Sequence, residues 1–191
     1  MDRVGWVSVA SAVGAVVAVG SAAYWTTSYL RSNHEQTQRL RSARKKYREL
    51  LSDLHECKGL LGYIDAESMP RAKALAKEIA SLQKQQQPID GGNDAIDDPK
   101  LEQRRRELLG IGEHILRLME RIDGVAPAQI VDAAGLEPWT EHDEALKAAA
   151  VRKGLGPVLD LAGDVRAIRR SLSHKAERRA KHIDALKKSI V

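Results

Sequence analysis

The sequence contains no phenylalanine, and aromatic residues make up only 4% of it. Sheets favour aromatic and β-branched residues, so this composition fits a small core of Leu, Ile, Val and Ala better, as helix bundles have. The only cysteine, Cys57, cannot form a disulfide within the chain, which favours a reducing compartment for the folded part. We therefore predict an all-α protein.

Residues that would support catalysis or metal binding are also sparse. The six histidines are scattered without the spacing of a metal site, and Cys57 has no second cysteine for a zinc site or a redox pair. The Gly91–Gly92 pair lacks the preceding strand and the lysine of a phosphate-binding loop. The sequence therefore predicts a protein that is not an enzyme and has no cofactor and no metal ion.

Charge is absent from one long segment. Between Val4 and Leu30 no side chain is charged, and the run exceeds the ~20 residues that a helix needs to cross a bilayer. Trp6 and Trp25 lie near its ends, where aromatic rings prefer the headgroup layer. We predict a transmembrane signal-anchor helix over 4–25. A cleaved secretory signal is disfavoured because the apolar run is too long and little positive charge precedes it.

Basic residues follow this segment in large excess over those before it, and the positive-inside rule then leaves the C-terminal body in the cytosol. Over 31–65, apolar residues recur at steps of three and four, which predicts a basic juxtamembrane amphipathic helix. Two interpretations of its basic half stay open: contact with anionic headgroups, or a solvated flank that only sets the topology. These basic residues are Arg31, Arg39, Arg41, Arg44, Lys45, Lys46 and Arg48.

The remaining chain predicts a three-helix bundle over 70–175, with loops at 88–99 and 124–139. We place the first bundle helix at 71–87 and treat the preceding amphipathic helix as an upstream extension. The second and third helices are marked by apolar stripes with helical spacing. These stripes consist of Leu108, Ile111, Ile115, Leu118, Ile122 and Val125, and of Val151, Leu155, Val158, Ala162, Val165, Ile168 and Leu172.

Charged residues lie opposite both stripes. Glu113, Glu120 and Asp123 fall within about 80° of one another on the second helix. On the third, the arginines at 152, 166 and 170 share one side, with Asp160 about 80° further round. The alternative is a solvated surface with ordinary i,i+4 ion pairs. We expect the binding site on these charged outer faces.

Two segments resemble a known family. Residues 120–125 (ERIDGV) and 148–165 (AAAVRKGLGPVLDLAGDV), with the motif RKGL at 152–155, resemble the BAG domain. That domain is a three-helix bundle that binds the nucleotide-binding domain of the 70-kDa heat-shock chaperone. The predicted N-terminal anchor extends the resemblance to the membrane-bound fungal BAG proteins of the endoplasmic reticulum and nuclear envelope.

The resemblance implies a nucleotide-exchange cochaperone that promotes release of ADP. It assigns polar chaperone contacts to Glu113, Asp123 and Arg152, with Lys153 in the same motif and Asp160 where the family often has glutamine. It also implies a single-pass protein of the endoplasmic reticulum or nuclear envelope, or alternatively of another membrane that faces the cytosol. Gly156–Pro157 departs from a continuous third helix, because proline in a helix interior breaks or kinks it.

A different interpretation depends on the basic C-terminal tail at 176–191. Its excess of Lys and Arg is suited to a ribosome, RNA or an acidic membrane, although no aromatic residue is available for base stacking. On this interpretation the protein is a membrane-anchored coiled-coil tether or a basic RNA-binding adaptor. A solvated helix is equally consistent with the pattern.

Overall fold

In the computed structural model the backbone is described for residues 4–85, 98–137 and 144–190, and side chains for most of these from residue 26 onward. Every element within these ranges is a helix, which confirms the all-α prediction for them. The predicted loop 88–99 lies almost wholly outside the described residues, as do the last residues of the 124–139 connector.

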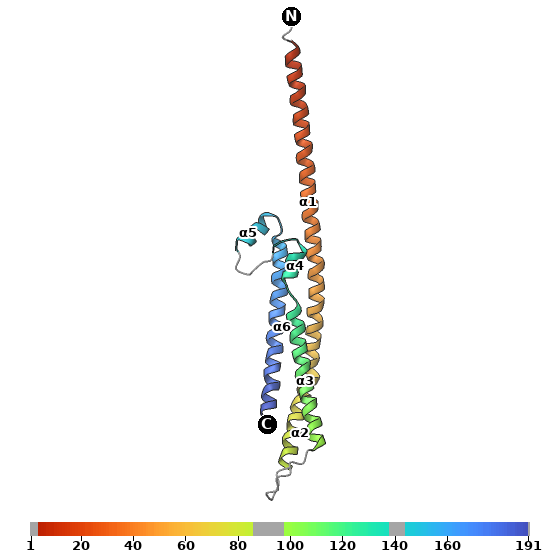
Figure 1. Ribbon diagram of the computed structural model, residues 1–191, viewed down its shortest axis with the longest axis vertical. Helices are drawn as coiled ribbons and strands as arrows, with labels where there is room; N and C mark the ends of the chain where they lie inside the picture. The colour runs from red at the N-terminus through yellow and green to blue at the C-terminus, as the bar shows by residue number, and fades with distance from the viewer. Residues whose placement is uncertain (1–3, 86–97, 138–143, 191) are drawn as a thin grey trace.

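The first long element is almost continuous. Helix α1 (Val4–Tyr63) passes through one π-helical turn, η1 (Ile64–Ser68), directly into α2 (Met69–Gln85). Figure 1 shows the N-terminal part of α1 projecting beyond the bundle, while its C-terminal part and α2 lie along the other helices. The first helix of the bundle is therefore this combined segment.

The π-helical turn joins the two segments that the sequence predicts as separate helices, 31–65 and 71–87. Ile64 and Met69 are both buried but are five residues apart, and five residues of α-helix would turn Met69 about 140° away from the core. In the wider turn the N–H of Met69 donates to the carbonyl of Ile64, an i→i+5 bond. Pro70, which has no N–H to donate, follows directly.

The second bundle helix is α3 (Pro99–Gly124), followed by the short α4 (Ala128–Ala133). Asp98 caps α3, since its side chain accepts a hydrogen bond from the Lys100 N–H at 2.9 Å, and Pro99 occupies the first turn. Its predicted apolar stripe is buried or partly buried along its whole length. The segment predicted as a loop at 124–139 thus contains one short helix within its described part, which ends at residue 137.

The motif RKGL forms the turn between α5 (Glu144–Arg152) and α6 (Gly156–Lys188). Gly154 has φ +69°, its N–H donates to Val151, and the Leu155 N–H donates to Ala150. This is a Schellman motif, in which glycine takes the left-handed conformation and the next apolar residue is buried. Pro157 then lies in the first turn of α6, where proline is tolerated.

The third helix is therefore interrupted at Gly156–Pro157. Because α5 is a separate piece, Val151 of the predicted stripe is 63% exposed. In α6, Arg169 takes the more inward position at which Ile168 was expected, and Ile168 is exposed. The other members of the predicted stripe, from Leu155 to Leu172, are buried.

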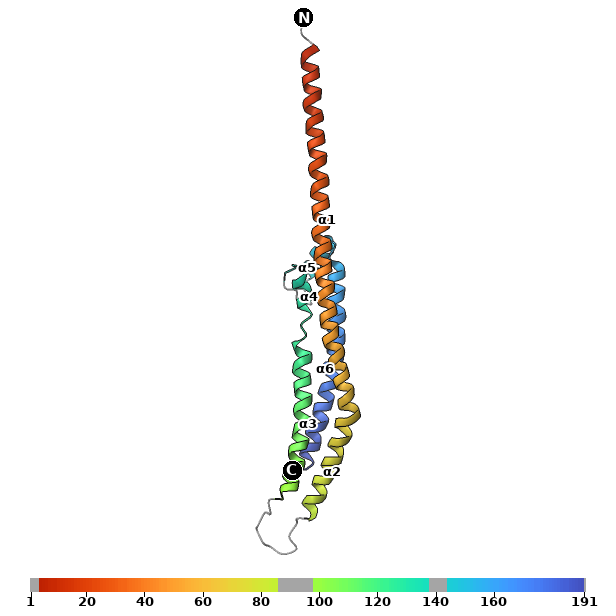
Figure 2. The ribbon, with the colours of Figure 1, turned by 90° about the vertical axis from the view of Figure 1, so that its right-hand side faces the viewer.

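The three long segments pack side by side and share one core. α3 lies against both α6 and α2, and α6 also packs on α1 (Figures 1 and 2). α3 runs opposite to the other two, because its N-terminus lies beside α2 and its C-terminus beside the upper half of α6. The largest fully buried side chains include Leu54, Leu75, Ile79, Leu108, Ile115, Ile122, Ile130, Leu155 and Ile183.

Two boundaries predicted from the sequence need correction. The 31–65 helix is not an upstream extension, since its apolar residues from Leu50 to Leu61 belong to the common core. The basic half of this helix is also part of α1, and its residues Leu40, Ala43 and Tyr47 pack on the same core. It is therefore not a separate surface helix. The segment 176–191 is not a separate tail either, because Ala176, Ile183 and Ile190 are buried in the same core.

The predicted membrane span falls largely on residues whose side chains lie outside the described part of the chain. The backbone of residues 4–25 is helical and continuous with the rest of α1. Among the residues whose side chains the structure describes, no helix is long and apolar enough to cross a bilayer.

A ring of charges joins α2 to α3 at the far end of the bundle. Arg71 pairs with Glu107 at 2.8 Å and lies 4.0 Å from Glu78. Arg104 pairs with Glu78 at 2.9 Å and with Glu107 at 3.1 Å. The hydrogen bond from Arg71 and the charge of Arg104 lower the pKa of Glu107 below its usual value of 4.5.

The charge ring predicts a pH dependence of stability. A lowered pKa in the folded state contributes stability above the unfolded-state pKa, near 4.5, and this contribution is lost as the pH falls through the folded-state value. As the pH is lowered below 4.5, the free energy of unfolding should therefore fall less in Glu107→Gln than in wild type. Urea denaturation at several pH values measures this. Glu67→Gln, at an exposed carboxylate outside the ring, is the control. An equal pH dependence in wild type and Glu107→Gln would contradict the assignment.

The α5–α6 turn predicts opposite effects of two glycine substitutions. Gly154→Ala should lower the free energy of unfolding by about 1–3 kcal/mol, because alanine is strained at φ +69° and a Cβ there would lie 1.9 Å from Gln36 Nε2. Gly163→Ala, within α6 and with open space around its Cβ position, should raise it by about 0.5–1 kcal/mol. Urea denaturation of both variants checks this; a neutral Gly154→Ala would exclude the left-handed turn.

Candidate functional site on the outer face of α3 and α6

Five residues form one exposed strip along α3, which we call the α3 stripe. Two turns of helix separate Leu109 from Leu116, and three carboxylates surround them within about 80° on the helical wheel. Leu109 is 51% and Leu116 is 54% exposed. The members of the α3 stripe are Leu109, Glu113, Leu116, Glu120 and Asp123.

α6 lies directly beside this stripe. A Cβ on Gly112 would lie 2.8 Å from Lys187 Nζ and 3.5 Å from Ile183 Cγ2, so this position of α3 faces α6. Further along, Arg169 of α6 lies 3.7 Å from Asp123. The α3 stripe therefore runs along the α3–α6 junction on the outside of the bundle.

Among the described residues, the ion-pair partner of Glu113 is a neighbour on its own helix. Its carboxylate lies 3.8 Å from Arg117 Nη2, and both side chains are largely exposed. Exposed pairs of this kind contribute about 0–1 kcal/mol, because water and salt screen the charges. The Glu113 carboxylate can therefore exchange Arg117 for a basic group of a partner at little cost.

Asp123 lies at the C-terminal end of α3, where Arg169 reaches across from α6. Arg169 Nη1 donates to the Val125 carbonyl at 3.3 Å, and its other nitrogen lies 3.7 Å from the carboxylate. A cation at this position is favourable because the last carbonyls of a helix carry partial negative charge. Asp123 itself remains 62% exposed.

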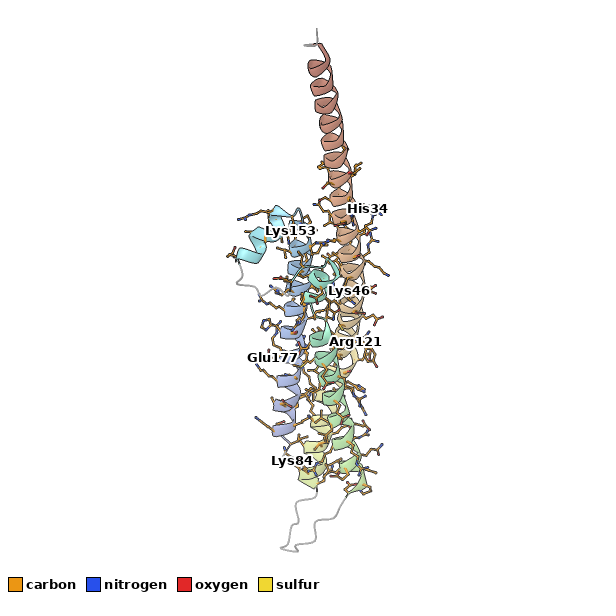
Figure 3. All side chains as sticks on the ribbon, turned by 45° about the horizontal axis from the view of Figure 1, so that its top comes forward. His34, Lys46, Lys84, Arg121, Lys153 and Glu177 are labelled. Carbon is orange, nitrogen blue, oxygen red and sulfur yellow. The ribbon has the colours of Figure 1, made fainter. Side chains whose placement is uncertain are left out.

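Arg152 and Lys153 lie at the end of the bundle from which α1 projects, as Figure 3 shows for Lys153. Both side chains are exposed. The turn that carries them is fixed to α1, because Gln36 Nε2 donates to the Gly154 carbonyl at 3.1 Å. Lys153 and Leu155 line a small polar pocket with Gln36 and its neighbours on α1.

The structure does not bring the predicted site residues into one cluster. Glu113 and Asp123 are ten residues apart on α3, or about 15 Å along its axis. Arg169, opposite Asp123, is thirteen residues from the start of α6. The turn that carries Arg152 precedes that start, so it lies about 20 Å from Arg169 along the axis of α6. Asp160 is exposed near that start, but on a side of α6 that faces away from the α3 stripe.

Sequence reasoning missed three members of this region. Arg169 was not singled out, although its four-residue spacing from the buried Val165 places it on the side of α6 that faces the bundle. No sequence pattern pointed to Gln36, because its hydrogen-bond partner, the Gly154 carbonyl, is 118 residues away in the chain. Leu116 falls outside the apolar stripe of α3, and its position among the carboxylates was the available clue.

The basic residues at 176–191 are largely engaged within the bundle. Arg179 binds Asp65 of η1 with two hydrogen bonds, which raises the pKa of the guanidinium. Lys181 pairs with Glu177 at 2.9 Å and lowers the pKa of that carboxyl. These contacts reduce the positive charge available to a partner at this end of the chain.

Comparison with known proteins gives no relative: the chain matches no model of a protein family, and no curated protein or solved structure matches it significantly. Among the described residues, no three His, Cys, Asp or Glu side chains gather where they would hold a metal ion. On the described surface of α3 and α6 the acidic α3 stripe and the basic turn at 152–155 are separate.

The weak coupling of Asp123 to Arg169 is testable without a partner. In a double-mutant cycle of Asp123→Asn and Arg169→Gln, the interaction free energy should be below about 1 kcal/mol, because the pair is long and exposed. Urea denaturation of the four proteins measures it. A coupling well above this limit would mean that Asp123 is a structural residue and not an available contact.

Proposed function

We propose that the chain is a cochaperone that binds the nucleotide-binding domain of the 70-kDa heat-shock chaperone and promotes release of ADP. Glu113 and Asp123 engage basic groups on one lobe of that domain, and Arg152 engages an acidic group on the other. Lys153 adds charge at the second contact, and Asp160 accepts hydrogen bonds next to it. No covalent step is involved, so the protein is a binding partner and not an enzyme.

The observation that carries the proposal is the exposed placement of Glu113 and Asp123 on the α3 stripe. Both carboxylates face outward from the bundle, about 15 Å apart, and among the described residues each has one long ion pair. A helix holds the backbone of both residues, so little backbone order has to be gained when a partner binds. Two carboxylates spaced in this way can bind two basic groups on one protein surface.

The distance between the two ends of the site supports contact with two lobes. The Arg152 turn is about 20 Å from Asp123 along the bundle and lies beyond the start of α6. If the charges match only an opened arrangement of the lobes, the bundle binds that arrangement more tightly. The equilibrium then shifts toward the open cleft by the difference in affinity, and ADP leaves faster.

We further propose that residues 4–25 anchor the protein in the endoplasmic reticulum or nuclear envelope, with the bundle in the cytosol. The support is the uncharged sequence of this segment and the excess of basic residues after it. Since α1 is one helix from Val4 to Tyr63, such an anchor would be rigidly connected to the bundle.

A second candidate function is binding of a polyanion such as RNA. One observation favours it: four basic residues on α1 are exposed on the side opposite the core, and within the described residues none has an ion-pair partner. They are Arg41, Arg44, Lys45 and Arg48.

The proposed function predicts the outcome of a nucleotide-release assay. The full chain should accelerate release of a fluorescent ADP analogue from the chaperone, and Asp123→Ala or Arg152→Ala should reduce the acceleration at least about tenfold. The reason is that loss of one partner of a desolvated charge pair costs about 2–5 kcal/mol in binding.

Matched controls are Asp53→Ala and Arg48→Ala, which remove exposed charges on α1 away from the α3 stripe. Both should leave the acceleration unchanged. No acceleration by folded wild type would reject the proposal. Loss of RNA binding in Arg48→Ala, with no effect of any variant on ADP release, would favour the second candidate.

A further inference from the structure

The two leucines of the α3 stripe have no role in the charge contacts described above. Leu109 and Leu116 are seven residues apart, so they lie within about 20° of each other on the helix. Glu113 lies between them along the axis, and Glu120 and Asp123 follow on the same side. The face with the available carboxylates is thus also an exposed apolar edge of α3.

Single exposed leucines are normal on protein surfaces and need no explanation. This pair differs because it repeats at two helical turns, which aligns both side chains along one line. Leu109 also borders an apolar hollow with Leu108 and Ile190, beside Arg105 and Lys187. The apolar surface therefore continues from α3 across the junction to the end of α6.

Charges and leucines contribute differently to a protein contact. Exposed charges orient the partner and raise the association rate, and salt screens them. Most of the affinity comes from a few apolar or aromatic groups that lose water near the centre of the contact. In the α3 stripe Leu116 holds the central position, since the three carboxylates surround it and Asp123 marks one end.

We propose that Leu116, supported by Leu109, is the apolar centre of the chaperone-binding surface. Its occupant is the nucleotide-binding domain of the 70-kDa chaperone, at a place where that domain presents an apolar patch between basic side chains. The inference rests on the proposed function and adds to it the group that supplies salt-independent affinity. Charge complementarity supports this occupant only through the proposed function: the carboxylates on both sides of Leu116 fit an apolar patch that has basic groups on both sides.

The test compares Leu116→Ala with Leu60→Ala in the full chain. Leu60 is a matched control, because it is a 44% exposed leucine in a helix, is not a member of the α3 stripe and borders a separate hollow between α1 and α3. Binding of the chaperone's nucleotide-binding domain is measured by calorimetry at low and high salt. Leu116→Ala should raise Kd about tenfold or more, and Leu60→Ala should leave it unchanged. Circular dichroism melting confirms that both variants fold.

Salt separates the apolar contribution from the ionic one. The ratio of Kd values between Leu116→Ala and wild type should persist at high salt, whereas the ratio for Asp123→Asn should shrink. If wild type binds and Asp123→Asn weakens binding while Leu116→Ala does not, the inference about Leu116 is overturned and the proposed function stands. An equal loss in Leu60→Ala also overturns it. If folded wild type does not bind at all, the proposed function itself fails.

Discussion

The bundle depends on burial of one apolar face that runs through α1, η1 and α2. α3 and α6 both pack against this face, and each also packs against the other, so the core exists only when all three segments are present. The π-helical turn maintains the face, because it compensates for the five-residue step between Ile64 and Met69. Without it the second half of the segment would rotate its apolar residues away from α3.

The position of the candidate site follows from this packing. Once the buried stripe of α3 faces the core and the Gly112 side faces α6, the α3 stripe is exposed in the described part of the structure. Its carboxylates and leucines remain in water on a rigid helix. The Arg152 turn is fixed independently, by the Schellman motif and by the Gln36 hydrogen bond to Gly154. The two ends of the site therefore keep a constant separation.

Much of this arrangement could be predicted from the sequence. Periodicity gave the buried residues of α3 and most of those of α6, and wheel positions placed Glu113 and Asp123 outside the core. Other features could not be read in this way. The segments predicted as separate helices at 31–65 and 71–87 are continuous, because Ile64 and Met69 between them are both buried in the core. Ile190 is also buried, although the residues around it are mostly polar. Contacts between distant residues, such as that of Gln36 with Gly154, leave no periodic pattern.

The most direct test of the central claim is a map of where the chaperone's nucleotide-binding domain touches the full chain. Hydrogen exchange with mass spectrometry, with and without that domain, provides it. The account predicts slower exchange in peptides that cover the α3 stripe and the turn at 152–155, with little change on the outer side of α1. Protection confined to the basic residues of α1, or no protection anywhere, would contradict it.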